Sequence, residues 1–300
     1  MIRKIITALI LLLLLLIAGV SLYHKANFSL PPKLIVMFIL ILIAAVALRF
    51  KLYWLRPFLL VTSVAYLGFY EGSCLCPNGA LQNIFMYIGM ERYGKIPFYA
   101  FEILLLFLLV FLLGNLYCGW VCHKGGIQEF LYRPSFAIKV PEKLDYWLKK
   151  MRYVFLGLAI LYPVLYKHKV FCKYDPFKAL FNLEGSTVLI ILLGVLLISS
   201  IFIYRPYCRY VCPLGAILGI VNSIGLFKID FTSKNECLNC IICENKCLLG
   251  SIRARGLDRV IVNRTLCFAC MECSRGCPKR VLEENNLLRI FPEKKKFSVK

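Results

Sequence analysis

Eight cysteines in the last quarter of the chain follow one spacing twice. Each copy reads C-x2-C-x2-C-x3-C: Cys237, Cys240, Cys243 and Cys247 form the first, and Cys267, Cys270, Cys273 and Cys277 form the second. Three thiolates at this spacing can ligate one [4Fe-4S] cluster from a short loop, and the fourth ligates the cluster of the other copy. We therefore assign Cys237, Cys240, Cys243 and Cys277 to one cluster, and Cys267, Cys270, Cys273 and Cys247 to the second. Zinc is less favoured, because zinc sites usually use two separated cysteine pairs or include histidine.

Two further cysteine pairs share the pattern Y-C-x3-C. They are Cys118 with Cys122, and Cys208 with Cys212, and each pair follows a long apolar stretch. This spacing predicts two thiols about one helical turn apart, on the same face. If an internal repeat brings the pairs together, the four thiols form one redox or metal site. Either a further metal centre or two dithiols would satisfy the pattern.

Three cysteines remain, in two stretches that extend the same repeat. Cys74 and Cys76 lie in residues 74–83, and Cys172 lies in residues 172–182; both stretches combine cysteine, proline and A-L-x-N. A functional role and a disulfide are both open for these thiols. An oxidising compartment would permit a bridge from Cys172 to Cys74 or to Cys76.

The composition predicts that these motifs are positioned by membrane helices. The chain of 300 residues is 60% hydrophobic, with a mean hydropathy of +0.73. Six apolar stretches are candidates to cross a hydrocarbon core of about 30 Å: 5–23, 34–48, 58–70, 98–117, 153–166 and 188–204. We predict an all-α integral membrane bundle of about six transmembrane helices in two related halves (residues 1–227). A small α+β ferredoxin domain of the bacterial 2×[4Fe-4S] type follows (residues 228–300).

The distribution of Lys and Arg predicts the orientation of this bundle. Positive residues gather at the N-terminus and in the segments after the second, fourth and sixth stretches, which are typical of cytoplasmic loops. We therefore expect a multi-pass protein of the inner (cytoplasmic) membrane with cytoplasmic N- and C-termini. The net charge of +21 suits contact with anionic lipid head groups. No nucleic-acid-binding motif is visible, so we expect none as a partner.

The sequence offers few candidate ligands for haem or nucleotide cofactors. His24, His123 and His168 all lie outside the middle of the apolar stretches, so a transmembrane bis-histidine haem is not supported. No glycine-rich nucleotide-binding motif occurs. Glu102 is an intramembrane carboxylate and hence a functional candidate, although a solvated side chain near the outer boundary fits the sequence equally well.

Helices with paired C-x3-C motifs, followed by a two-cluster ferredoxin, resemble the NapH/NosR family of membrane ferredoxins. The resemblance covers the second to the sixth predicted helix and the C-terminal domain. It implies electron transfer between cytoplasmic donors or the quinone pool and a membrane-bound or periplasmic reductase system. Two features depart from the family: His123 follows Cys122, where Pro213 follows Cys212, and the soluble flavin domain of NosR-type members is not visible.

The sequence thus favours a membrane-bound iron–sulfur electron-transfer protein. It would act as the electron-carrier subunit of an oxidoreductase system with redox partner proteins, quinone being a candidate, and we assign no catalytic residue. The alternative is a membrane metal-handling or maturation factor whose thiols bind or reduce copper, because soft thiolates select Cu(I). The direction of electron flow is not encoded in these motifs.

Overall fold

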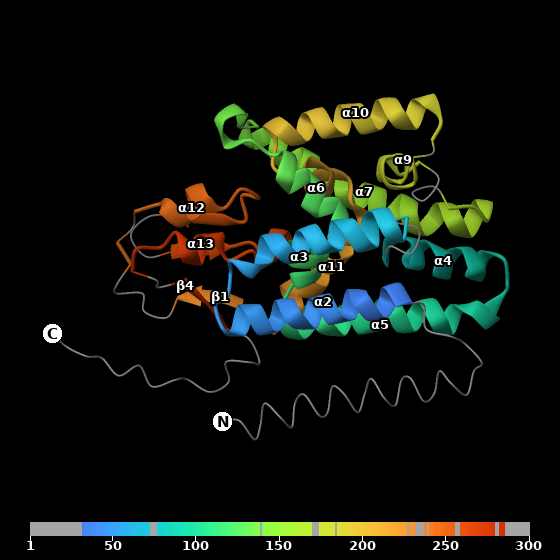
Figure 1. Cartoon of the computed structure of the whole chain (residues 1–300), viewed down its shortest axis with the longest axis horizontal. Helices are drawn as coiled ribbons and strands as arrows, with labels where there is room; N and C mark the ends of the chain where they lie inside the picture. Colours follow the sequence, from blue (N-terminus) through green and yellow to red (C-terminus); the bar gives the residue numbers. More distant parts are fainter. Residues whose placement is uncertain are drawn as a thin grey trace, which may run out of the picture.

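The computed structural model shows a mostly helical chain with small β-sheets gathered at one end (Figure 1). It describes residues 32–72, 77–138, 140–169, 174–183, 185–226, 228–231, 237–238, 240–255, 259–279 and 282–285. The helical part contains α2 (Pro32–Arg49), α3 (Leu55–Ser63), η1 (Val64–Tyr70), α4 (Pro77–Gly89), η2 (Tyr93–Lys95), α5 (Ile96–Leu113), η3 (Tyr117–Val121), α6 (His123–Leu131), η4 (Pro134–Phe136), α7 (Glu142–Tyr166), α9 (Pro176–Asn182), α10 (Thr187–Phe202), η5 (Tyr207–Val211) and α11 (Pro213–Ile224). The C-terminal part contains β1 (Lys228–Phe231), α12 (Ile242–Lys246), β2 (Ile252–Arg255), β3 (Arg259–Val262), η7 (Arg264–Leu266), α13 (Glu272–Arg275) and β4 (Leu282–Asn285).

The helical elements repeat in order, which follows the internal repeat of the sequence. Each half contains a helix, a short helix, a long apolar helix, a π-helical turn and a further helix. These are α3 with η1, α4, α5, η3 and α6 in the first half, and α7, α9, α10, η5 and α11 in the second. The halves interlock, because α4 packs on α7, α6 on α10 and α11 on α5. Each π-helical turn also has a hydrogen bond to the other half, since Arg205 donates to Cys118 O and the Tyr207 amide donates to Gln128 on α6.

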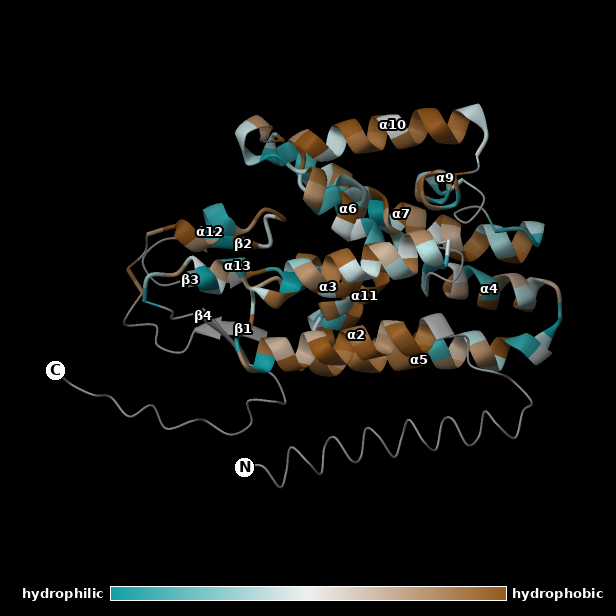
Figure 2. Cartoon of the chain, viewed as in Figure 1, coloured by the Kyte–Doolittle hydropathy of each residue, from teal (hydrophilic) through white to brown (hydrophobic). Residues whose placement is uncertain are grey.

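The described residues contain one helix, Tyr93–Leu113, that is long and apolar enough to cross a membrane. Pro176–Asn182 and Thr187–Phe202 pass the same test together, but they meet at an angle of 99°. The predicted stretches 34–48 and 58–70 form shorter apolar helices, and 153–166 is the second part of α7. Stretch 5–23 lies outside the described residues. Figure 2 shows hydrophobic residues concentrated on α2, α5 and α10, and six spanning helices stay a prediction.

The long apolar helices differ from the prediction in where they end. Residues 98–117 were expected to form one helix, yet α5 ends at Leu113, because Gly114 adopts a φ of 82° that stops the helix. Similarly, α10 ends at Phe202 rather than at residue 204. Each cysteine pair therefore lies on its own turn beyond the long helix.

Glu102 is not in contact with water, so it differs from the solvated side chain that the sequence equally allowed. It lies on α5 with 0% of its surface exposed. Helix α5 packs against α4 and α11, so this carboxylate lies in the protein interior.

The described C-terminal residues form two short helices and two antiparallel strand pairs, an α+β arrangement, and its assignment as a ferredoxin domain stays a prediction. Strand β1 pairs with β4, with Lys228 opposite Asn285, and β2 pairs with β3, with Ile252 opposite Val262. Helices α12 and α13 pack against each other between these pairs. The domain boundary at residues 227 and 228 stays a prediction.

Candidate functional site

The two C-x3-C motifs adopt the same backbone conformation. In each, the amide of the second cysteine donates to the carbonyl five residues earlier, from Cys122 to Tyr117 and from Cys212 to Tyr207, both at 2.8 Å. The cysteines thus lie on a π-helical turn and not on the α-helical turn that the spacing predicts. The second cysteine leaves each turn in an extended conformation, with ψ of 111° at Cys122 and 112° at Cys212.

His123 takes the place of proline in the first motif without changing the loop. An extended residue before proline is expected, because proline disfavours helical geometry in its predecessor, and Cys122 adopts the same geometry before His123. The imidazole is buried, and its ring packs edge-on against Phe181 at 5.2 Å between centroids. Burial, together with Lys124, lowers the pKa of His123 to about 3, so the side chain stays neutral.

The structure brings the two cysteine pairs together across the halves. Burial raises the pKa of Cys118, and the neighbouring thiols of Cys122, Cys212 and Cys208 raise it further. Among the described residues, no three His, Cys, Asp or Glu side chains meet as they would around a single metal ion. We call Cys118, Cys122, Cys208 and Cys212 the four-thiol site. Cys74, Cys76 and Cys172 lie outside the described residues.

Helix α6 supports the four-thiol site from the opposite half. The Gln128 side chain donates to Cys208 Sγ at 3.4 Å and accepts from the Tyr207 amide at 2.9 Å. On the other side, the Gly215 amide donates to Cys212 Sγ at 3.3 Å. Donors to sulfur favour the thiolate form that a metal or a redox reaction requires.

A buried ion network, which the sequence reasoning missed, holds the first motif. Arg56 pairs with Glu129 at 2.7 Å, and Arg205 pairs with the same carboxylate. Arg56 Nε donates to Gly119 O at 3.1 Å, and Arg205 Nη1 donates to Cys118 O. Burial alone would raise the pKa of Glu129, but the two guanidiniums outweigh it and lower that pKa to about 2. Two cations and one anion therefore leave positive charge beside the thiols.

The second ferredoxin motif docks directly on the first C-x3-C motif. Trp120, which is fully buried, donates from Nε1 to Ala269 O at 2.9 Å. A Cβ atom at Gly119 would overlap the carbonyl oxygen of Phe268. Only glycine therefore permits this close approach of the two backbones. Asn222 on α11 adds a hydrogen bond of 3.3 Å to Cys267 O.

The first ferredoxin motif contacts the second C-x3-C motif. Arg209, between Cys208 and Cys212, donates to Leu248 O at 3.2 Å and pairs with Asp145 at 2.6 Å. Asp145 also accepts from Tyr210 at 2.8 Å and pairs with Lys149 at 2.6 Å. The second ferredoxin motif thus contacts one π-helical turn, and the residue after the first ferredoxin motif contacts the other.

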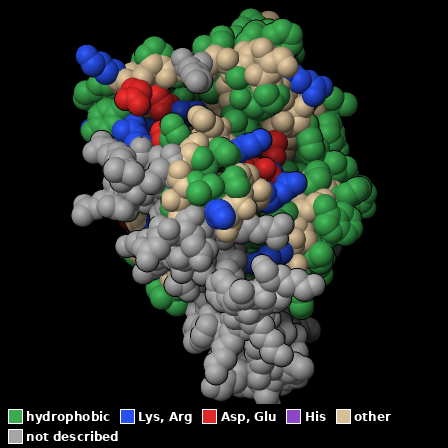
Figure 3. All heavy atoms as spheres, turned by 90° about the vertical axis from the view of Figure 1, so that its left-hand side faces the viewer, with side chains coloured by type: hydrophobic (Ala, Val, Ile, Leu, Met, Phe, Trp, Pro, Cys, Tyr) green, Lys and Arg blue, Asp and Glu red, His purple; other side chains and the backbone are tan. Residues whose placement is uncertain are grey.

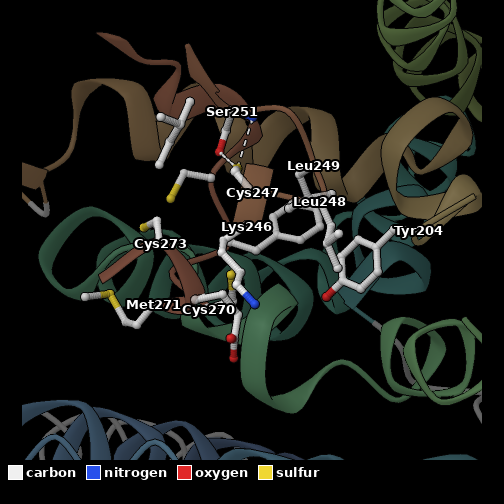
Figure 4. A pocket seen from close by; sticks show the side chains of 13 residues that line it. Tyr204, Lys246, Cys247, Leu248, Leu249, Ser251, Cys270, Met271 and Cys273 are labelled. Atoms are coloured by element: carbon white, nitrogen blue, oxygen red, sulfur yellow. Dashed lines mark hydrogen bonds between the residues drawn. The ribbon is translucent and has the colours of Figure 1, made fainter. Parts of the chain in front are cut away.

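A cavity in the ferredoxin part contains the four cysteines assigned to the second cluster. Its lining includes Cys247, Cys267, Cys270 and Cys273. Figure 4 shows Cys247, Cys270 and Cys273 around the cavity and Ser251 beside Cys247; the Ser251 amide donates to Cys247 Sγ at 3.3 Å. Burial raises the pKa of Cys267 to about 12, and bound iron would supply the positive charge that keeps such thiols deprotonated. The donor set fits a [4Fe-4S] cluster.

The other assigned set lies closer to solvent. The Cys243 thiol lies near those of Cys277 and Cys237, which raise its pKa after the larger effect of burial. Cys240 is exposed. Cys277, the fourth cysteine of the second motif, is thus a neighbour of Cys237 and Cys243 in the first, and crossed ligation stays a prediction.

We expect Gly119→Ala to separate the ferredoxin part from the first motif. The added methyl group meets the Phe268 backbone, which cannot rotate away, and overpacking of this kind costs about 1–3 kcal/mol. Reduction of the four-thiol site through the ferredoxin should slow, as measured by rapid-mixing absorbance. Gly157→Ala on α7 is the matched control, because nothing lies within 4 Å of its added atom. Equal rates in both variants would contradict the proposed contact.

Comparison with known proteins yields one family match. A family model described as a 4Fe-4S binding domain matches residues 97–141 and residues 186–232. The two matches contain Cys118 with Cys122 and Cys208 with Cys212, one pair each. The same domain is thus matched once in each half.

Several relatives carry names that bear on function. YccM of Escherichia coli, whose name refers to electron transport, is 27% identical over 268 residues, which are 82% of this chain and 72% of YccM. The regulatory protein NosR of Stutzerimonas stutzeri is 28% identical over 169 residues, 53% of this chain and 23% of NosR. The ferredoxin-type protein NapH of Haemophilus influenzae is 26% identical over 183 residues, 56% of this chain and 61% of NapH. No solved structure matches the chain.

Proposed function

Because the chain is an iron–sulfur electron-transport protein of the NapH/NosR type, we propose that it conducts electrons between its ferredoxin domain and the four-thiol site. The ferredoxin domain would face the cytoplasm and exchange electrons with a cytoplasmic carrier or the quinone pool. The acceptor or donor at the other end would be a membrane-bound or periplasmic redox protein. The chain would cross the inner membrane several times, with both termini in the cytoplasm.

One observation carries this proposal: the loop of Cys267 and Cys270 is fixed against the turn of Cys118. The hydrogen bond from Trp120 to Ala269 O and the close approach at Gly119 join the two loops by direct contact. Short, rigid contacts favour electron transfer, because its rate falls steeply with distance and with reorganisation of the surroundings.

The chain's own residues would hold, space and insulate the redox groups. Bound [4Fe-4S] clusters supply one-electron chemistry at potentials set by hydrogen bonds, charge and solvent exposure. Cys237, Cys240, Cys243 and Cys277 would hold the outer cluster, and Cys267, Cys270, Cys273 and Cys247 the inner one. The four-thiol site would be a third redox centre, either a further metal centre or a pair of dithiols. Gln128 and the Gly215 amide would orient its sulfur atoms.

We expect Cys277→Ser and Cys247→Ser to damage different clusters. If ligation is crossed, Cys277→Ser perturbs the cluster of the first motif, and Cys247→Ser perturbs that of the second. The full-length protein would be purified anaerobically and examined by iron analysis and EPR spectroscopy. About eight iron atoms per chain should belong to the two ferredoxin clusters. Each variant should change one EPR signal and leave the other intact.

The matched pair also tests the assignment of the fourth ligands. If Cys277→Ser gave the same spectrum as Cys273→Ser, ligation would lie within each motif. Zinc in place of iron would end the electron-transfer proposal. Stoichiometric copper with reduced electron transfer would favour the alternative, a membrane factor whose thiols bind or reduce copper.

A further inference from the structure

The ferredoxin part contains two copies of one cysteine loop, and corresponding residues in the two copies are 30 positions apart in the sequence. Leu238 in the first copy corresponds to Phe268 in the second, and Ile241 corresponds to Met271. Ile241 and Met271 both adopt the left-handed conformation, with φ of 54° and 61°, immediately before α12 and α13. The two copies therefore present their corresponding side chains from the same backbone geometry.

The second copy uses its two apolar side chains to dock on the helical part. Phe268 is 3% exposed and Met271 is 0% exposed, and both belong to the main hydrophobic core with Trp120. The Arg205 guanidinium lies 5.9 Å from the centre of the Phe268 ring. Phe268 and Met271 thus form the contact between the second ferredoxin motif and the first C-x3-C motif.

The first copy leaves the corresponding pair in solvent. Leu238 is 59% exposed and Ile241 is 52% exposed. Cys240 lies between them in the sequence, and it is exposed whereas Cys237, Cys243 and Cys277 are partly buried. Apolar side chains beside the exposed edge of a redox site are typical of surfaces that bind a partner.

Helices α12 and α13 and the residues that directly follow them lie beside this pair and carry a small excess of basic over acidic side chains: Lys246, Arg275 and Lys279 against Glu244 and Glu272. Lys246 and Lys279 are exposed, and Arg275 is half exposed and pairs with Glu272 at 3.0 Å. Figure 3 looks at this end of the molecule, where Lys and Arg side chains are visible together with some Asp and Glu side chains among hydrophobic ones. A chain with a net charge of +21 repels a second copy of itself. Its own C-terminal segment, with Lys294, Lys295 and Lys296, does not complement a basic rim either.

We propose that Leu238 and Ile241, with the basic rim of Lys246, Arg275 and Lys279, form the docking surface for a small acidic one-electron carrier protein. This proposal rests on the proposed function. In each encounter, one electron passes between the carrier and the site of Cys237, Cys240, Cys243 and Cys277, so that one partner is oxidised by one electron and the other is reduced by one. The apolar pair would pack against the carrier, as Phe268 and Met271 pack against the helical part.

The test uses full-length protein that contains its clusters, and reduced flavodoxin, a small acidic carrier, as the probe. Ile241→Glu removes an apolar contact and adds a repelling charge. It should slow the second-order reduction by flavodoxin about tenfold or more at low ionic strength. Reduction by dithionite, a small molecule that needs no docking surface, should keep its wild-type rate. Phe136→Glu, which adds the same charge at a residue 62% exposed on η4, should leave both rates unchanged.

A second variant keeps the proposal falsifiable if Ile241→Glu disturbs the cluster. Lys279→Glu changes the rim alone, and it should also slow flavodoxin and weaken the dependence of the rate on salt. Wild-type rates in a variant with intact EPR signals would overturn the docking surface while leaving the electron-transfer function standing. A wild-type dimer that Ile241→Glu converts to a monomer would assign the surface to a second copy and overturn the proposal. Protein without iron would instead overturn the function itself.

Discussion

Replacing both Cys118 and Cys208 with alanine is expected to abolish electron transfer across the membrane and to leave both ferredoxin EPR signals intact. The two thiols come from different halves and lie in the same four-thiol site. The ferredoxin cysteines are assigned to two other clusters, which should therefore assemble in the variant. The measurement is electron transfer in sealed vesicles, from a reduced carrier on the ferredoxin side to an acceptor trapped on the other.

The same variant distinguishes the forms that the four-thiol site could take. If the site holds a [4Fe-4S] cluster, iron should fall by about four atoms per chain. If it forms dithiols, iron should be unchanged and the thiol titre should fall. If it holds copper, the copper content should fall instead.

Ser199→Ala with Ser200→Ala is a suitable control. Both hydroxyls bond to Leu196 O within their own helix, α10, so the double change is similarly small and lies away from the thiols. Wild-type transfer without Cys118 and Cys208 would reduce these cysteines to packing residues.

The cysteine spacings predicted much of the candidate site, because their chemistry is local. The spacing alone assigned Cys247 and Cys277 as fourth ligands, and this assignment stays a prediction; in the structure Cys247 lines the cavity of the second motif and Cys277 is a neighbour of Cys243 in the first. The spacing did not predict the π-helical turns at Cys118 and Cys208. An i to i+4 pattern looks the same in sequence whether the turn is α or π, and tertiary packing decides between them.

Contacts between distant segments could not be predicted from a single sequence. Arg56 lies on α3, Glu129 on α6 and Arg205 in the segment between α10 and η5, and no periodicity links them. The requirement for glycine at position 119 arises only from the close approach of the Phe268 backbone, which the sequence does not show. Glu102 was ambiguous for the same reason, because its burial depends on which helices pack against α5.

Glu129→Ala is expected to destabilise the protein strongly. The substitution leaves the guanidiniums of Arg56 and Arg205 buried without their anion, and breaking such a network by removing one partner typically costs about 3–5 kcal/mol. Both guanidiniums also hold the backbone carbonyls of the Cys118 turn. The loss of cluster absorbance during denaturation in detergent should therefore occur at a lower denaturant concentration. Glu142→Gln, at an exposed acid on α7, should stay within about 0.5 kcal/mol of wild type.

The electrostatic role of this network has a separate readout. Because the pKa of Glu129 is lowered to about 2, its contribution to stability is complete above the ordinary carboxyl range and is lost only as the pH falls towards 2. Stability and potential should therefore show no titration from Glu129 between about pH 5 and 9. Glu129→Gln keeps the volume but leaves two uncompensated cations beside the four-thiol site, and extra positive charge favours the reduced, more negative state. The reduction potential measured there should rise in Glu129→Gln and not in Glu142→Gln. An unchanged potential together with lower stability would limit the network to a structural role.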